Sequence, residues 1–316
     1  MTQIPRPEHP QPQMKREHWK NLNGEWDFSF DFGCSGIDQK WQEGKTDWEK
    51  KILVPFCPES DLSGIGYKDF IPGVWYHRTI TLTGEELKGD LLLHFGAVDY
   101  DARVWINGVE AGRHQGGYVS FTFNITKLVK KGENDITLFA ADDVRGGKQP
   151  KGKQSHFFYS RGCDYTRTTG IWQTVWLEWV PESYIEKVQY YPNLAEATLG
   201  IKAVVKGQGT LEAKAFYVGE PCGSVSAKSE GGTVTMTLPL SRLEKWEPGH
   251  GRLYDLTLTY GEDKVESYFG MREVRLDGEK FLINDKSVFQ RLVLDQGFYP
   301  DGIYTCLLYT SDAADD

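Results

Sequence analysis

The stretch that decides the fold is residues 96–126, with the sequence GAVDYDARVWINGVEAGRHQGGYVSFTFNIT. The apolar run 104–106 leads into Asn107 and Gly108, a pair that readily supplies positive φ at both central positions of a type I′ turn, so a β-hairpin is predicted here. Residues 118–125 then alternate large apolar with polar side chains, which is typical of a strand with one buried face. An antiparallel β-sandwich is therefore expected around this stretch.

Further short strands are predicted on both sides of it, at residues 24–30, 74–82, 91–95, 135–140 and 174–180. Many short strands separated by turn residues, without a helix of more than one or two turns, indicate a jelly-roll sandwich over residues 21–182. Residues 1–20 are rich in proline and are expected to form an extended arm. Residues 142–171 form one long, polar, Gly-rich connection, and a connection of that length is usually functional or disordered.

A second domain is predicted over residues 183–274, where six or seven short strands indicate an immunoglobulin-like sandwich. It lacks the Cys-Trp-Cys spacing of antibody domains, so packing alone would hold it. Residues 281–288 then form a predicted hairpin, and the apolar run 289–294 is typical of a parallel barrel strand buried on both faces. The expected fold class is all-β, with a jelly roll, an immunoglobulin-like sandwich and, at 275–305, the truncated start of a (β/α)8 barrel.

The last eleven residues, 306–316, do not continue the barrel pattern. They can be reverse-translated into a sequence that resembles the end of a transposase sequencing adapter. We therefore expect them to be read-through, and the natural chain to continue beyond Thr305.

The composition of the chain argues against some classes of binding partner. The formal net charge of −9 argues against a nucleic acid or an anionic membrane as the main partner, and no apolar run is long enough to span a bilayer. The amino terminus has no targeting signal, so a cytoplasmic protein is expected. The five Cys lie far apart, which favours neither a disulfide framework nor a zinc site.

The aromatic content of 13%, with ten Trp, fits either a sandwich core or sugar-stacking surfaces. Which of the two applies to Trp75, Trp105 and Trp172 stays open at this point. We expect the side chains of Trp105, Tyr118, Phe121 and Phe123 in the core.

No catalytic set can be assembled from the sequence, which has no nucleophile elbow, phosphate loop or zinc-protease motif. The strongest group of polar residues lies in the long connection, where Arg161, Asp164 and Arg167 fall within eight residues. The Asp164 carboxylate could accept hydrogen bonds from sugar hydroxyls or coordinate a cation. The alternative is a surface ion pair with Arg161 or Arg167.

Six motifs, in this order along the chain, resemble glycoside hydrolase family 2: Leu22-Asn23-Gly24-Glu25-Trp26, Val74-Trp75-Tyr76, Val104-Trp105-Ile106-Asn107-Gly108, His114-Gln115-Gly116-Gly117-Tyr118, Asp164-x-x-Arg167-x-x-Gly170-Ile171, and Trp246-x-Pro248 followed by Leu253-Tyr254. The resemblance spans nearly all of residues 20–305. It implies a sugar-binding jelly roll, an immunoglobulin-like domain and a catalytic (β/α)8 barrel, in that order.

The resemblance implies an exo-acting retaining β-glycosidase with two barrel glutamates, both expected beyond Thr305, so residues 1–305 are expected to be inactive. The β-galactosidases and β-glucuronidases of the family fit equally well. The expected substrate-binding residues are Asp164 and Arg167 from the shared motif, and Asp295 and Gln296 at the carboxyl end of the first barrel strand. No cofactor is required, although a cation beside Asp164 is allowed, and the full-length protein is compatible with a homo-oligomer.

The competing hypothesis is a non-catalytic carbohydrate-binding or interaction protein made of two β-sandwiches. The apolar run 289–294 separates the two, because a self-sufficient binding protein has no use for a barrel strand followed by nothing. A calcium-dependent lectin is disfavoured, since no Asp-rich loop with alternating ligands is present.

Overall fold

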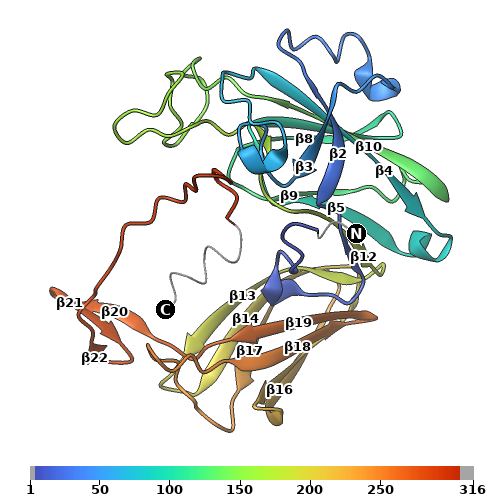
Figure 1. The fold of residues 1–316 in the computed structure, drawn as a ribbon. Coiled ribbons are helices and arrows are strands. Elements are labelled where there is room, and N and C mark those ends of the chain that lie inside the picture. The colour runs from blue at the N-terminus through green and yellow to red at the C-terminus, as the bar shows by residue number, and fades with distance from the viewer. Residues whose placement is uncertain (1–3, 307–316) are drawn as a thin grey trace. The chain divides into compact units, whose positions relative to one another are not determined.

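The jelly roll consists of two main sheets and a short antiparallel strand pair (Figure 1). One sheet has the order β1 (Trp19–Asn21), β12 (Val175–Val180), β5 (Asp90–Phe95), β9 (Phe121–Asn124). The other has the order β3 (Lys50–Val54), β2 (Gly24–Phe30), β4 (Gly73–Leu82), β10 (Gly132–Ala141), β7 (Asp101–Ile106), β8 (Val109–Gln115). The pair is β6 (Val98–Asp99) with β11 (Gly170–Ile171). This computed structural model describes residues 4–306.

The chain divides into two compact units. The first holds the jelly roll, comprising residues 4–10, 19–179 and 295–306, and the second comprises residues 11–18 and 180–294. The helical turns in the described residues are short 3₁₀ segments: η1 (Pro12–Met14), η2 (Trp41–Glu43), η3 (Asp61–Ser63) and η4 (Glu85–Leu87). No helix in residues 4–306 is long and apolar enough to cross a membrane.

The predicted hairpin is confirmed. β7 pairs with β8, and Asn107 and Gly108 between them have φ of 52° and 80°, the positive values that this turn requires. The strand expected at residues 118–125 is shorter, because β9 begins only at Phe121. Tyr118 is 44% exposed, so its expected place in the core was wrong. Its ring borders the aromatic residues described below.

Alternating side chains fill the jelly-roll core from both sheets, as the period of a half-buried strand requires. Trp26 and Phe28 of β2 are buried among Tyr76, Leu93 and Val104. The three Trp whose role the sequence left open are all buried: Trp75 is 0%, Trp105 4% and Trp172 9% exposed. They are therefore core residues and not sugar-stacking surfaces.

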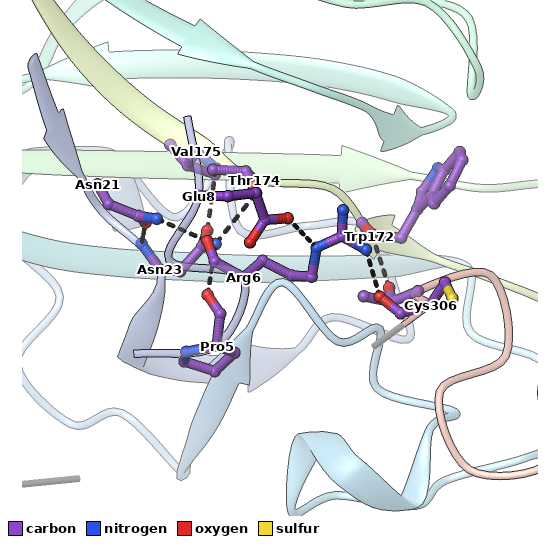
Figure 2. Close-up of polar contacts among 10 residues, drawn as sticks. Pro5, Arg6, Glu8, Asn21, Asn23, Trp172, Thr174, Val175 and Cys306 are labelled. Carbon is purple, nitrogen blue, oxygen red and sulfur yellow. Dashed lines mark hydrogen bonds and ion pairs between the residues drawn. The ribbon is translucent and has the colours of Figure 1, made fainter. Parts of the chain in front are cut away.

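Asn23, from the first family motif, joins three parts of the jelly roll (Figure 2). Its amide nitrogen donates to the Pro5 carbonyl (3.0 Å) and to Thr174 Oγ1 (3.1 Å), and its oxygen accepts from the Val175 N–H (3.0 Å). The side chain is 1% exposed, so a substitution would leave several buried partners unsatisfied. The motif thus has a structural role, fixing the amino-terminal arm and β12.

The second unit is an antiparallel sandwich of seven strands. One sheet has the order β13 (Tyr184–Asn193), β14 (Thr198–Lys206), β17 (Gly232–Pro239), and the other β16 (Glu220–Ser229), β15 (Gly209–Tyr217), β18 (Tyr254–Tyr260), β19 (Asp263–Phe269). Cys222 is the cysteine of this unit, and it forms no disulfide, as expected of an immunoglobulin-like domain held by packing. Arg16 binds this unit with a buried, two-pronged ion pair to Asp263 (2.8 and 2.9 Å).

The hairpin predicted at 281–288 forms as β21 (Lys280–Ile283) and β22 (Lys286–Ser287), joined on its other edge by β20 (Val274–Asp277). The predicted barrel strand at 289–294 does not form. Those residues pair with no strand in the described chain, and Phe289 and Val293 are 86% and 92% exposed. A parallel strand needs neighbouring strands and covering helices, and residues 4–306 supply none to this segment.

The chain after 294 packs on the jelly roll. Thr305 Oγ1 donates to the carbonyls of Trp172 (2.6 Å) and Pro55 (3.1 Å), and Ser60 Oγ donates to the Asp301 carbonyl (2.5 Å). The Cys306 carbonyl accepts from Arg6 (Figure 2). Apart from Cys306, the predicted adapter-derived tail, 306–316, lies outside the described residues.

Candidate functional site

The connection between β10 and β11, residues 142–169, carries the candidate site. Figure 1 shows it as light green loops projecting at the upper left. It contains no strand, and two isolated bridges join its arms, Gln154 with Tyr165 and Arg161 with Asp164. We call residues 142–169 the long loop. Its shape must come from side-chain contacts, because regular backbone pairing is almost absent.

Arg167 organises the long loop from inside. The residue is 2% exposed, and its guanidinium donates to the carbonyls of Ser155, Phe157, Phe158 and Lys68. It also lies over the Phe70 ring, 4.2 Å from its centroid. The planar fork of guanidinium donors suits this task, since one side chain satisfies several carbonyls at once. The structure thus gives Arg167 a positioning role, and its expected contact with substrate stays a prediction.

Asp164 lies at the turn of the same loop. Its backbone exchanges hydrogen bonds with Arg161 (3.0 and 3.1 Å), but its carboxylate pairs with neither Arg161 nor Arg167. The nearest cation is Lys151, whose Nζ lies 3.9 Å from Oδ2, and both side chains are 29% exposed. A pair at that distance and exposure contributes little energy. The carboxylate therefore stays available to a ligand that offers hydroxyl donors.

The two residues expected at the end of a barrel strand have different surroundings. Gln296 is attached to the long loop, because its side-chain oxygen accepts from Lys153. Asp295 instead accepts from the N–H of Gly297 (2.8 Å) in its own turn. Tyr165, next to Asp164, stacks on Phe298 with ring centroids 4.2 Å apart. The structure thus brings Gln296, but not the Asp295 carboxylate, into contact with the loop of Asp164.

Aromatic side chains also attach residues 298–304 to the jelly roll. The Tyr118 and Tyr304 hydroxyls are hydrogen-bonded at 2.9 Å, and Trp172 Nε1 donates to the Gly117 carbonyl (2.7 Å). Tyr304 also contacts the rings of Trp172 and Phe298, at 5.1 and 4.5 Å between centroids. Trp172 therefore packs against residues 298–304 and holds them in place.

Three carboxyl groups are buried at the base of the long loop: Glu59, Asp99 and Asp142. Asp142 accepts from Gln149 Nε2 (2.6 Å) and Thr169 Oγ1 (3.0 Å). Asp99 accepts from Gln154 Nε2 (2.6 Å), and Glu59 from the Thr169 N–H (3.1 Å). All of these donors belong to the long loop. Glu59 and Asp99 therefore hold the long loop against the sandwich, and Asp142 ties the two ends of the loop together.

Burial raises the pKa of each of these acids: to about 8 for Glu59, to about 8 for Asp99 and to about 6 for Asp142. Mutual repulsion adds to the effect, since Asp142 raises the pKa of the other two. This cluster was not predicted from the sequence, because its members lie up to 83 positions apart (59 to 142). Its one local signal was a carboxylate directly beside a buried apolar strand residue, as at Val98-Asp99.

Metal ligands are not gathered at the site. Within residues 4–306, no three His, Cys, Asp or Glu side chains lie where they could hold a metal ion together. The charged neighbour of the Asp164 carboxylate is the cation Lys151, which would repel a metal ion. A cation beside Asp164 would thus need further ligands from outside the described residues or from the substrate.

Comparison with known proteins decides the family. The model of the family 2 glycosyl hydrolase sugar-binding domain matches residues 19–181, and the model described as glycosyl hydrolases family 2 matches residues 183–272. The chain belongs to glycosyl hydrolase family 2. The resemblance seen in the sequence motifs is thereby confirmed, as is the all-β fold of a jelly roll followed by an immunoglobulin-like sandwich.

The curated relatives of this family 2 chain include β-glucuronidases of pig, of Paenibacillus borealis and of human, which are 27%, 25% and 24% identical to it. The matches cover 89%, 85% and 89% of this chain but 48% of each relative. The chain thus spans about half the length of the curated relatives it matches.

Solved structures show the same fold. The β-glucuronidase of Ruminococcus gnavus in complex with D-glucuronic acid superposes with a TM-score of 0.81 at 20% identity, over 95% of this chain and 54% of that one. At that identity the likeness establishes the fold alone.

Proposed function

We propose that this chain forms the amino-terminal, sugar-binding and immunoglobulin-like part of a retaining exo-β-glucuronidase. The observation that carries the proposal is the match of both domains to family 2 together with relatives named β-glucuronidase. The sequence motifs alone fitted a β-galactosidase equally well, and these relatives favour the glucuronide.

In this proposal the two catalytic glutamates belong to a barrel outside residues 1–305. Retaining hydrolysis needs two carboxyl groups about 5–5.5 Å apart, one as nucleophile and one as acid and base. Asp164 would contribute binding, not bond cleavage: its carboxylate, which is 29% exposed, would accept hydrogen bonds from sugar hydroxyls. The buried acids cannot do this, since their hydrogen bonds hold the long loop.

The test compares the longer protein proposed here, which includes the catalytic barrel, with residues 1–305 alone. We expect the whole protein to hydrolyse 4-nitrophenyl β-D-glucuronide in preference to the galactoside and mannoside, and residues 1–305 to hydrolyse none. A preference for the galactoside would refute the proposed specificity. Turnover by residues 1–305 would refute the location of the catalytic glutamates.

Asp164→Asn tests the proposed binding role in the whole protein. Losing a charge-assisted hydrogen bond costs about 1.5–3 kcal/mol, so kcat/KM should fall roughly tenfold to a hundredfold. The matched control is Asp47→Asn, because the Asp47 side chain is 89% exposed and belongs to the same unit. Equal kcat/KM for the two variants would exclude Asp164 from the substrate site.

A further inference from the structure

The charge of the long loop is opposite to that of the rest of the chain. The whole chain has 36 Lys and Arg against 45 Asp and Glu. The long loop instead has more basic than acidic residues: Arg145, Lys148, Lys151, Lys153, Arg161 and Arg167 against Asp142, Asp143 and Asp164. One surface of an acidic protein therefore attracts anions.

The exposed cations of this loop are not neutralised. Arg145, Lys148 and Arg161 are exposed, and within the described residues none of them forms an ion pair. Some exposed arginines elsewhere do, such as Arg113 with Asp101 and Arg275 with Asp285. Neither Asp142, which is buried, nor Asp164, whose nearest cation is Lys151, forms an ion pair with these three cations. The free cations thus keep their full attraction for an external anion.

Exposed aromatic rings accompany these cations. Phe158 and Tyr159 are 63% and 62% exposed, although neither is loose. Phe158 packs edge-on against Phe70 (5.0 Å between centroids), and Tyr159 stacks on Phe157 (5.9 Å). Rings that are already held in place lose little conformational entropy when a ligand covers them.

The ring of Phe70 contacts two separate parts of the long loop. Arg145 lies 4.1 Å from the ring centroid, and Phe158 packs against the same ring in an edge-to-face arrangement. Arg161 lies 5.3 Å from the centroid of Phe157, one residue before Phe158. Arg145 and Phe158 are therefore neighbours through Phe70, and Arg161 and Tyr159 are neighbours through Phe157, the residue next to Phe158.

We propose that this surface, formed by Arg145, Lys148, Phe158, Tyr159 and Arg161 and called here the basic aromatic surface, binds an acidic polysaccharide. Guanidinium groups bind carboxylate and sulfate with two parallel hydrogen bonds, and aromatic rings cover the apolar faces of sugar rings. This binding is a property of the long loop itself and is independent of the proposed glucuronidase activity.

A nucleic acid fits the surface less well. Its charge density is high, and the strand would extend beyond the loop over a chain with a net charge of −9. A polyuronate or sulfated glycan carries its charges further apart and offers sugar faces to Phe158 and Tyr159. Polyuridylate RNA therefore serves as the competing ligand in the test.

The test measures binding of the full chain to immobilised chondroitin sulfate, neutral dextran and polyuridylate RNA. We expect binding to chondroitin sulfate that weakens roughly tenfold between about 50 and 200 mM NaCl, and no binding to dextran. Absence of binding to chondroitin sulfate at the lower salt, or equal affinity for the RNA, overturns the proposal. Activity is not measured, so the outcome is separate from that of the proposed function.

Two triple variants locate the site. Arg145→Ser, Lys148→Ser and Arg161→Ser together should weaken binding about tenfold or more. The matched control is Lys127→Ser, Lys130→Ser and Lys131→Ser, which removes the same charge from exposed lysines that also lack ion pairs in the described residues but have no exposed large apolar side chain at 120–134. Equal losses in both triples would reduce the interaction to net charge and overturn the proposal.

The aromatic half of the surface needs its own variant. Phe158→Ser with Tyr159→Ser leaves the charge unchanged and should weaken binding to chondroitin sulfate several-fold, provided that the thermal unfolding midpoint stays at the wild-type value. Unchanged affinity in this folded variant would contradict a role for the rings.

Discussion

At the scale of single residues, Arg167 shows how one side chain can shape a loop that lacks regular structure. Its guanidinium binds carbonyls of residues 155–158 in the long loop and the carbonyl of Lys68, which is 99 positions away in the chain. The sequence motif identified Arg167 as important, and placed it beside Asp164 as a substrate contact. It could not show these partners, because carbonyl positions depend on how the distant segment around Lys68 folds.

We predict that Arg167→Lys destabilises the first unit by about 3 kcal/mol, because the single ammonium group leaves buried carbonyls unsatisfied. Urea unfolding followed by tryptophan fluorescence measures this directly, since nine of the ten Trp belong to that unit and only Trp246 does not. Arg161→Lys, at an exposed position of the same loop, is the control and should change stability by less than about 0.5 kcal/mol. Wild-type stability of Arg167→Lys would show that the carbonyl contacts contribute little.

At the scale of elements, the sequence was informative where structure depends on local chemistry. The β7–β8 hairpin follows from two adjacent residues, Asn107 and Gly108, that adopt positive φ easily. The same holds for alternating strands such as β2, whose side chains show their buried face directly. The segment 289–294 has the composition of a buried strand, but its own sequence does not suffice to form one. A strand would form there only beside neighbouring strands, which residues 4–306 do not provide.

The attachment of the long loop was beyond prediction for a related reason. Asp142 looked like an ordinary polar residue at the start of a loop, and Glu59 like part of a turn-rich segment. Only the fold brings these acids under Thr169 and Gln154, where burial changes their chemistry.

These acids predict a loss of stability with rising pH. Burial, together with repulsion from Asp142, raises the pKa of Glu59 from 4.5 to about 8, so the folded state keeps a proton that the unfolded chain releases. This contribution is complete below pH 4.5 and is lost as the pH rises through about 8. The slope is about 1.4 kcal/mol per pH unit for each retained proton. Besides Asp142, the titratable groups that interact electrostatically with Glu59 are Asp99, Arg167, Tyr76 and Cys57.

Glu59→Gln should make the fall of the unfolding free energy with pH less steep by the contribution of one proton, because the amide cannot ionise. Urea unfolding of the full chain at about pH 5, 6, 7 and 8 measures it, with the exposed Glu43→Gln as control. A wild-type slope in Glu59→Gln would mean that Glu59 is already ionised in the folded protein.

At the scale of the whole molecule, chain segments that are distant in sequence belong to one unit. The first unit uses residues 4–10, then 19–179, and finally 295–306 after the entire second unit has been completed. The second unit takes up residues 11–18, whose Arg16 binds Asp263. The order of domains along the sequence was predictable from strand patterns. The assignment of residues 295–306 to the first unit and of residues 11–18 to the second was not predictable, because each depends on single contacts. One of them is the contact of Thr305 with the carbonyls of Trp172 and Pro55.

The exposed segment 289–294 makes a prediction about the molecule as a whole. Phe289, Leu292 and Leu294 are 86%, 80% and 83% exposed and unpaired, so chymotrypsin should cut the chain there before it cuts within either sandwich. Mass spectrometry of early digests identifies the sites, and serine at all three positions should slow this first cut at least about tenfold. In the whole protein proposed above, a barrel would bury the same residues and the first cut should move elsewhere. Early cleavage at 289–294 in both proteins would mean that this segment is not a barrel strand, whereas resistance in both would mean that the sandwiches themselves cover it.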